Sequence, residues 1–168
     1  MKYKYVWLGQ SILKFEVPLD IFTTINQVYE KNFNKLHKAN KQLVGKIENE
    51  HSLYYNGIES DKMTKHNTLP NNVIEWFYSV FRFYLKANKI ERYQLKVASI
   101  WVNEMKDNEY NPIHVHQADL FTGLSSVMIL TLPSHYGKEY SSENNPMNGA
   151  LQIIGNVNGQ FANVDYTP

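Results

Sequence analysis

The spacing of apolar residues changes near residue 90 of this chain. Before that point two apolar stripes recur every three to four residues, which predicts amphipathic helices. The first begins at Pro18–Asp20 and runs to about Asn40, and the second begins at Leu69–Pro70 and ends near Asn88. After residue 90 the apolar residues alternate over short stretches, which predicts strands. Helices followed by strands favour an α+β fold over an alternating α/β fold.

The strand-like stretches are bounded by turn-forming residues. They cover residues 95–105, 113–116, 124–132, 150–154 and 160–165, with one or two further short strands between Tyr3 and Val17. A Gly-Asn-Val-Asn-Gly turn at 155–159 separates the last two, and residues 41–69 and 134–148 are predicted to be polar, mostly exposed connections. Short strands at this spacing predict an antiparallel sandwich or barrel.

Length, charge and cysteine content bound the class of protein. A chain of 168 residues is one domain by size, divided here into a strand-and-helix part at 1–92 and a strand-rich part at 93–168. The formal net charge of +1 gives no strong signal for nucleic acid or membrane surfaces. The absence of cysteine excludes disulfides and thiolate metal ligands. Without a signal peptide or an apolar run of about 20 residues, we expect a soluble cytoplasmic protein.

The segment Glu109-Tyr-Asn-Pro-Ile-His-Val-His-Gln-Ala-Asp119 carries the residues suited to chemistry. His114 and His116 lie two positions apart, so on an extended backbone both imidazoles project from the same face. The preceding Asn-Pro predicts a rigid turn that fixes where they point. Two neutral nitrogens with the Asp119 carboxylate nearby are suitable ligands for a divalent transition metal. A structural role for both histidines stays open, as does a turn-capping role for Asp119.

The sequence around this segment resembles that of one enzyme group. The resemblance rests on three segments: Trp101-Val-Asn-Glu-Met105, the Asn-x-x-His-x-His pattern at 111–116 and Leu124-Ser-Ser-Val-Met-Ile-Leu-Thr-Leu-Pro133. They resemble phage-borne and bacterial 2-oxoglutarate/Fe(II)-dependent oxygenases, with a likeness over essentially the whole chain that is strongest from Ser99 to Pro133. The resemblance implies a double-stranded β-helix, a cupin-like jelly roll, with the N-terminal helices packed on the sheet. Members of this group bind one Fe(II), decarboxylate 2-oxoglutarate to succinate and hydroxylate a C–H bond.

The resemblance implies roles for particular residues. His114 and His116 match the paired-histidine motif and are the first-choice metal ligands. The commoner superfamily pattern is His-x-Asp, so Asp119 is an alternative ligand if a local bulge brings it together with His116. Asn103 and Ser126 lie on strands expected to line the barrel and are candidate contacts for 2-oxoglutarate.

This chain departs from the group's pattern at its end. The distal histidine ligand and the arginine that pairs with 2-oxoglutarate would follow the turn that Tyr166-Thr-Pro168 resembles. The β-helix is therefore expected to be incomplete at its C-terminus, as in a truncated member with impaired activity. The arginines that are present, Arg82 and Arg92, lie in or near the second predicted helix.

Two other functions remain open. One is a non-catalytic module, either a cupin-like metal-binding fragment or a phage structural or assembly component. The other is a homo-oligomer in which an open sheet edge pairs with a second copy of the chain. The substrate class stays open as well, from nucleic acid and peptide to sugar and small molecule. Of the remaining side chains, Trp101 is expected in the core, and His37, His51 and His66 are expected to be solvated.

Overall fold

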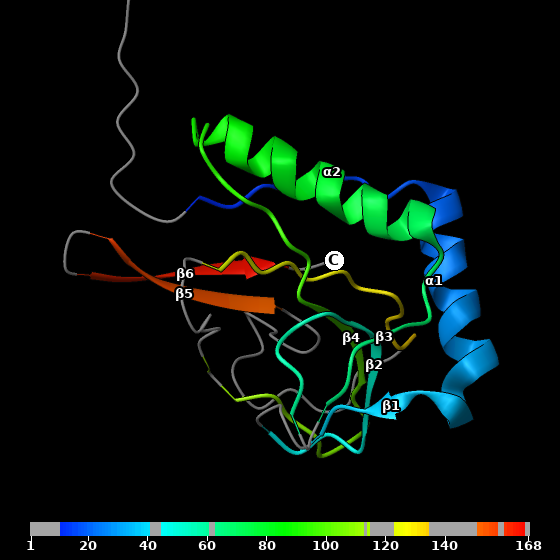
Figure 1. Cartoon of the computed structure of the whole chain (residues 1–168). Coiled ribbons are helices and arrows are strands. Elements are labelled where there is room, and N and C mark those ends of the chain that lie inside the picture. The colour runs from blue at the N-terminus through cyan, green and yellow to red at the C-terminus, as the bar shows by residue number, and fades with distance from the viewer. Residues whose placement is uncertain are drawn as a thin grey trace, which may run out of the picture. The chain divides into compact units, whose positions relative to one another are not determined.

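The computed structural model describes residues 11–40, 45–60, 63–112, 114, 123–134, 151–157 and 160–166. Contacts divide the chain into two compact units, one of residues 15–126 and one of residues 1–14 with 127–168. The elements form a mixed α+β structure with a small, open antiparallel sheet and two α-helices, as Figure 1 shows. The α+β prediction is confirmed at this level, and the single-domain prediction stays a prediction.

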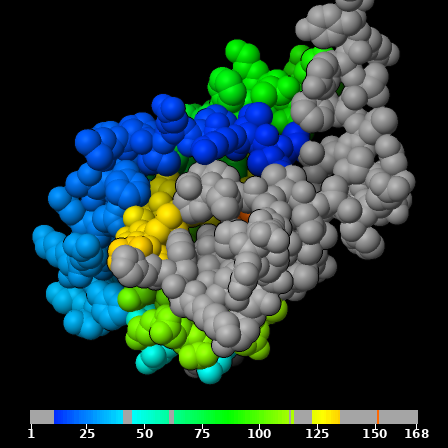
Figure 2. Space-filling model, turned by 180° about the vertical axis from the view of Figure 1, so that it is seen from behind, coloured from blue at the N-terminus to red at the C-terminus, as the bar shows by residue number. Residues whose placement is uncertain are grey.

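Helix α1 spans Leu19–Asn32 and continues as a 3-10 helix, η1, over Phe33–Lys35. Pro18 precedes it with a fixed φ of −56°, and Asp20 in the first turn complements the positive end of the helix dipole. Ile21 and Ile25 are buried, and Figure 2 shows another part of this blue segment at the surface. The predicted end at about Asn40 is wrong, because the chain enters a short strand at His37.

Helix α2 spans Asn71–Ala87 and confirms the second predicted helix. Its buried residues, Val73, Ile74, Phe77 and Leu85, come from the apolar stripe of the sequence. Lys89 ends the helix with a φ of 59°, and Ile90 N–H donates to Leu85 O at 2.9 Å. This is the Schellman arrangement, which closes the last turn. Helices α1 and α2 contact each other.

The sheet is built around one central strand, β2, at Asn49–Tyr55. Strand β4, Ser99–Glu104, pairs antiparallel with β2 from Asn49 to Tyr55. Two short strands, β1 at His37–Lys38 and β3 at His66–Asn67, pair one after the other with the opposite edge of β2. Strand β4 lies within the predicted strand 95–105. The prediction of a mostly exposed connection over 41–69 is wrong, because β2 there is buried from Asn49 to Leu53.

The apolar core of unit 15–126 lies between the helices and this sheet. Its members come from both helices, from β2 and from the connections that lead into the strands. They are Ile21, Ile25, Leu36, Ala39, Ile47, Leu53, Met63, Leu69, Val73, Ile74, Phe77, Leu85 and Val97. None of the helices in the described ranges has the length and apolarity needed to cross a bilayer.

The second unit contains an antiparallel hairpin. Strands β5, Leu151–Val157, and β6, Gln160–Tyr166, pair from Leu151↔Tyr166 to Val157↔Gln160. They confirm the last two predicted strands, although β5 extends through part of the predicted 155–159 turn. The strand predicted at 124–132 is wrong, because that stretch is not assigned as strand. Residues 11–17 are not strand either, and the rest of the prediction for Tyr3 to Val17 lies outside the described residues. Apolar, β-branched composition favours a strand but does not supply the partner strand that its hydrogen bonds require.

Candidate functional site

His114 is the one predicted metal ligand that lies among the described residues. Its side chain is exposed, and its Nδ1 lies 2.7 Å from the carbonyl oxygen of Pro112. A carbonyl oxygen can only accept, so Nδ1 carries the ring proton in this contact. In the neutral ring, Nε2 is then the nitrogen with the lone pair. Metal-binding histidines are held in the same way, with the other ring N–H donated to a carbonyl or carboxylate.

The backbone leading into His114 is tied to a segment far away in the sequence. Lys46 and Tyr110 exchange both backbone hydrogen bonds, at 2.9 and 3.1 Å. Gly45, at φ +114°, lies so close to this backbone that a Cβ there would come within 2.5 Å of Tyr110 O. A residue with a side chain would therefore be both strained and obstructed at position 45. The turn predicted at Asn111-Pro112 thus starts from a fixed point.

The Glu109 carboxylate adds two hydrogen bonds to the Lys46–Tyr110 pairing, and we call the whole arrangement the anchor of the His114 segment. Its Oε1 accepts the backbone N–H of Glu48 at 2.8 Å, and its Oε2 accepts that of Lys106 at 2.7 Å. These two hydrogen bonds favour the charged form of the Glu109 carboxyl and lower its pKa. The bond from Lys106 has the larger effect, and the bond from Glu48 has the smaller one. An ionised Glu109 therefore closes the turn from Lys106 and ties it to the distant segment at Glu48, ahead of His114.

His116 and Asp119, the other two predicted ligands, lie outside the described residues. Within the described ranges, no group of three or more His, Cys, Asp or Glu side chains is placed to hold a metal ion. The fit to a metal can therefore be examined at His114 alone. There the contact of Nδ1 with Pro112 O is compatible with metal binding through Nε2.

A second set of polar residues gathers on one face of the sheet. Glu50 and Ser52 alternate along β2, Asn103 pairs with Glu50, and His37 pairs with Ser52. Residues at these positions share a face, which we call the polar sheet face. His66 joins it from β3, because its ring contacts Ser52. The polar sheet face is thus defined by Glu50, Ser52, Asn103, His37 and His66.

Glu50 and Asn103 face each other on this surface with unsatisfied oxygens. Glu50 is 3% exposed, and neither its Oε1 nor the buried Oδ1 of Asn103 has a hydrogen-bond partner. Burial, followed by the negative charge of Glu109, raises the pKa of the Glu50 carboxyl. Two opposed acceptors without a donor would be satisfied by a donor group placed between them, or by a proton on Glu50.

Ser52, His66 and His37 form the other end of the polar sheet face. His66 Nδ1 lies 2.8 Å from Thr64 O and its Nε2 lies 2.9 Å from Ser52 Oγ, whose hydroxyl also lies 3.4 Å from Tyr54 O. With Nδ1 donating to Thr64 O, a neutral His66 ring can accept at Nε2 from Ser52 Oγ. The His37 ring stacks on that of His66 at 4.1 Å between centroids. Partial desolvation of the exposed ring, followed by electrostatic interaction with His66, lowers the pKa of His37. A serine paired with an oriented imidazole can act as a nucleophile, but Ser52 is only 2% exposed, so the pair is closed to a substrate in this conformation.

The opposite face of the sheet packs against α1. His51 is 1% exposed and lies between aromatic rings, 4.7 Å from Phe33 and 5.9 Å from Tyr29 by centroids. Burial, followed by the charge of Lys38, lowers its pKa. Tyr29 Oη donates to Glu104 Oε2 at 3.1 Å, and burial and Glu104 together raise the tyrosine pKa. The expectation that His51 is solvated is wrong, and His66 is half-buried rather than solvated.

The remaining predicted residues are placed as follows. Asn103 lies half-buried on β4, as expected for a strand residue, and its contact with 2-oxoglutarate stays a prediction. Ser126 is exposed and lies outside any strand, so the strand on which that prediction rested is wrong for this position. Trp101 pairs with Ser52 and is half-buried rather than part of the core.

Sequence reasoning missed the polar sheet face because β2 reads Asn-Glu-His-Ser at its buried end. Such residues are typical of exposed loops, and only Leu53-Tyr54-Tyr55 carries a strand signal. A register shift at Leu53, between Ser52 and Tyr54, further breaks the alternation that would reveal the strand. No protein-family model, curated protein or solved structure matches the chain.

Proposed function

We propose that this chain belongs to the Fe(II)- and 2-oxoglutarate-dependent oxygenases of the double-stranded β-helix class, with His114 and His116 as iron ligands. The observation that carries the proposal is the orientation of His114, whose Nδ1 is engaged by Pro112 O at 2.7 Å. With the ring proton on Nδ1, the lone pair of a neutral ring lies on Nε2, the nitrogen that would bind the metal. The proposal also rests on the resemblance in sequence of the Asn-x-x-His-x-His segment and its flanking segments to that enzyme group.

Iron and 2-oxoglutarate would supply the oxidising chemistry that hydroxylates a substrate C–H bond. The residues of this chain would hold and orient the iron ligands. The paired hydrogen bonds of Lys46 and Tyr110, with the Glu109 carboxylate, fix the backbone from which the ligand segment departs. A metal site needs such an outer layer, because ligands that are oriented before binding lose less entropy when the ion arrives.

The polar sheet face supports a role in binding a polar small molecule. Asn103 offers an amide that can donate to a carboxylate. Burial raises the pKa of Glu50 and so lowers the cost of protonating it beside an anion, and the protonated carboxyl can donate a hydrogen bond. This face is consistent with the predicted contact between Asn103 and 2-oxoglutarate.

Metal titration tests the proposal. Mn(II), which is stable in air, replaces Fe(II) in calorimetric titrations of the unmodified chain, His114→Ala and His37→Ala. His37 is an exposed histidine of the same unit and serves as the matched control. We expect His114→Ala to weaken Mn(II) binding at least about tenfold, the loss that even an outer-layer change causes. His37→Ala should leave the affinity unchanged, and equal affinities for all three proteins would contradict the proposal.

A second titration separates the oxygenase from the metal-binding module that is its alternative. 2-Oxoglutarate is added to the chain with and without saturating Mn(II). An oxygenase site binds 2-oxoglutarate more tightly when the metal is present, because the co-substrate shares the metal with the protein. Binding of Mn(II) without any effect on 2-oxoglutarate would favour the non-catalytic cupin-like module.

A further inference from the structure

Two histidine rings stack on each other at the edge of the sheet. His37 lies on β1 and His66 on β3, and their rings are nearly parallel, with 22° between the ring planes and 4.1 Å between the centroids. Both strands pair with the same edge of β2, one after the other, while β4 occupies the opposite edge. The stack thus joins two strands that follow each other along β2.

The two strands that carry these rings are only two residues long each. Beside β1, the backbone N–H of Ala39 donates to Glu50 O at 2.8 Å, and beside β3 that of Thr68 donates to Leu53 O at 2.9 Å. Such short strands form few ladder hydrogen bonds, so side-chain contacts carry a larger share of their attachment. A change in the stack therefore changes how firmly this edge of the sheet is held.

His66 can accept a proton without losing a hydrogen bond. Its Nδ1 lies 2.8 Å from Thr64 O, and its Nε2 lies 2.9 Å from Ser52 Oγ. In a protonated imidazole both nitrogens donate. Ser52 Oγ can then accept from Nε2 and turn its own proton toward Tyr54 O, at 3.4 Å. One positive charge is thus compatible with the stack.

A second proton, on His37, places two like charges in contact. The ring centroids are 4.1 Å apart, and none of the described carboxylates lies within salt-bridge distance of either ring. Desolvation, followed by electrostatic interaction with His66, lowers the pKa of His37, which is the direction that repulsion requires. Two unit charges about 4 Å apart in water repel by an amount that changes an equilibrium constant about fivefold.

The other titratable groups around the pair do not offset this repulsion. The Tyr55 ring of β2 lies 6.3 Å from that of His66, and a tyrosine carries no charge in mild acid. Burial raises the pKa of the Glu50 carboxyl on the same face of β2, so its charge is lost earlier as the pH falls. Lys38 pairs with His51 and so lies on the opposite face of the sheet. The charged residues next to the two strands, all exposed, are Lys35, Glu59 and Lys65.

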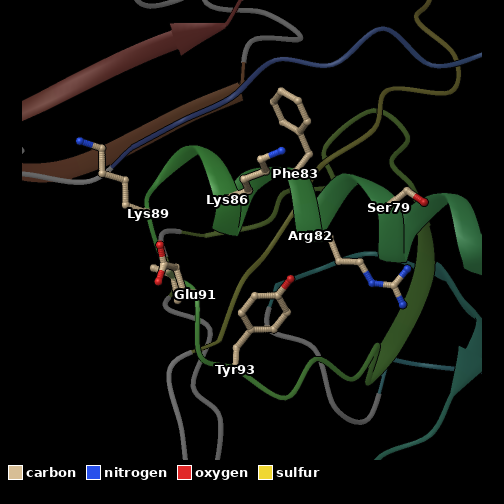
Figure 3. A pocket seen from close by; sticks show the side chains of 8 residues that line it. Ser79, Arg82, Phe83, Lys86, Lys89, Glu91 and Tyr93 are labelled. Carbon is tan, nitrogen blue, oxygen red and sulfur yellow. The ribbon is translucent and has the colours of Figure 1, made fainter.

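The histidine pair differs from the cationic side chains at the end of α2. There the described residues line a pocket of about 690 Å³, and Figure 3 shows the Arg82, Lys86 and Lys89 side chains directed away from one another. Arg82 lies over the Tyr78 ring, 5.4 Å from its centroid. These charges are spread apart, whereas the two histidine rings are held in contact. Only in the histidine pair does protonation change the contact itself.

We propose that His37 and His66 form a pH-sensitive clasp, which holds β1 beside β3 near neutral pH and loosens when both rings are protonated. The loosened edge exposes Ser52, which is 2% exposed in the closed arrangement. His37 lies opposite Ser52 on β1, and His66 is hydrogen-bonded to its hydroxyl, so both rings of the clasp adjoin this residue. The clasp is independent of the proposed iron site, since it uses neither His114 nor His116.

Hydrogen exchange of single backbone amides tests the clasp. The Ala39 and Thr68 amides report opening of this edge, and the Phe77 amide of α2 reports unfolding of the core. Because the pKa of His37 is lowered in the closed form, closure is complete above the ordinary histidine pKa of about 6.5 and weakens as the pH falls below it. The opening constant of Ala39 should rise about fivefold more than that of Phe77 between about pH 7.5 and about pH 5.

The same experiment at high salt separates repulsion from other effects of acid. About 1 M salt should reduce the difference between Ala39 and Phe77, because it screens the two ring charges. Equal changes at Ala39 and Phe77 in acid would overturn the proposal, as would a difference that salt leaves unchanged.

Two variants remove the charge pair from opposite sides. His37→Phe and His66→Phe each keep an aromatic ring that can stack and that does not titrate. His51→Phe is the control, because His51 is a buried histidine on the opposite face of β2. The additional opening of Ala39 in acid should disappear in both clasp variants and persist in His51→Phe. Its persistence in a folded His37→Phe or His66→Phe chain would overturn the proposal.

Discussion

Glu50 of β2 and Asn103 of β4 are directly paired across the sheet, and each holds a buried side-chain oxygen that has no hydrogen-bond partner. Natural structures keep few such groups, because each costs about 1–3 kcal/mol when it is left unsatisfied. The pair is therefore either completed by a bound donor group or tolerated at a cost to stability. Both cases make it the most informative position on the polar sheet face.

Glu50→Gln should stabilise the chain at neutral pH by about 1 kcal/mol. The pKa of Glu50 is raised in the folded protein by burial and by Glu109, so its contribution to stability is present below the unfolded value of about 4.3 and is lost as pH rises through the folded pKa. Glutamine has no charge to bury, and its amide can donate to Asn103 Oδ1. Urea unfolding at neutral pH and near pH 4 measures the effect, which should shrink at the lower pH.

Glu48→Gln is the control for this change, because the Glu48 side chain is 73% exposed and pairs only with the exposed Lys106 at 3.5 Å. Its effect should stay within about 0.5 kcal/mol. A Glu50→Gln variant less stable than the unmodified chain at neutral pH would show that the Glu50 charge has a partner, contrary to the unsatisfied pair described here.

His51→Phe should reduce the loss of stability in mild acid. Burial and Lys38 lower the pKa of His51 in the folded chain, so its contribution is full above the unfolded pKa of about 6.5 and is lost as pH falls from there toward the folded pKa. Phenylalanine can fill the place between Phe33 and Tyr29 without titrating. Free energies of unfolding measured between about pH 7 and about pH 5 should fall less steeply for the variant. Parallel curves for the two proteins would mean that His51 protonates freely.

Gly45→Ala should destabilise the chain by about 2 kcal/mol, because φ is +114° and the new Cβ would press on Tyr110 O. It should also weaken Mn(II) binding, since the anchor of the His114 segment would move. Gly57→Ala is the control. There the Cβ meets the Tyr55 ring, a side chain that can rotate away, so thermal unfolding should show a smaller loss. Equal losses would indicate that the backbone near Gly45 adjusts as easily as the Tyr55 ring does.

Lys89→Gly should raise the free energy of unfolding by about 1 kcal/mol, the typical relief of left-handed strain. Asn108 also has a positive φ, at 61°, but asparagine tolerates this conformation. Asn108→Gly is therefore expected to gain only a few tenths of a kcal/mol. Chemical unfolding of both variants compares the two positions directly, and a larger gain at Asn108 would contradict the assignment of strain to Lys89.

The sequence predicted the elements in which apolar spacing and tertiary burial agree. Helix α2 and strand β4 fall where periodicity placed them, because Val73, Ile74 and Phe77 both set the pattern and fill the core. Strand β2 was missed because its buried residues are polar, so burial there depends on contacts with α1 and β4 that a local pattern does not encode. The stretch 124–132 shows the reverse case, in which apolar composition is present without strand pairing.

In the candidate site, too, the sequence shows the features that are local along the chain and does not show those that depend on tertiary contacts. The Asn-Pro-Ile-His-Val-His segment is visible in sequence because its ligand types and spacing are local. The hydrogen bonds that orient His114 come in part from Pro112, two residues away, and the anchor depends on Gly45 and Lys46, more than sixty residues earlier.

The most direct test of the central claim follows the histidine ring signals in proton NMR spectra while small amounts of Mn(II) are added. The paramagnetic ion broadens the signals of the side chains that bind it. The proposed iron site predicts that His114 and His116 broaden first, while the rings of His37, His51 and His66 stay sharp at the same concentration. A His114 signal that stays sharp while those of other histidines broaden would contradict the assignment of His114 as a metal ligand.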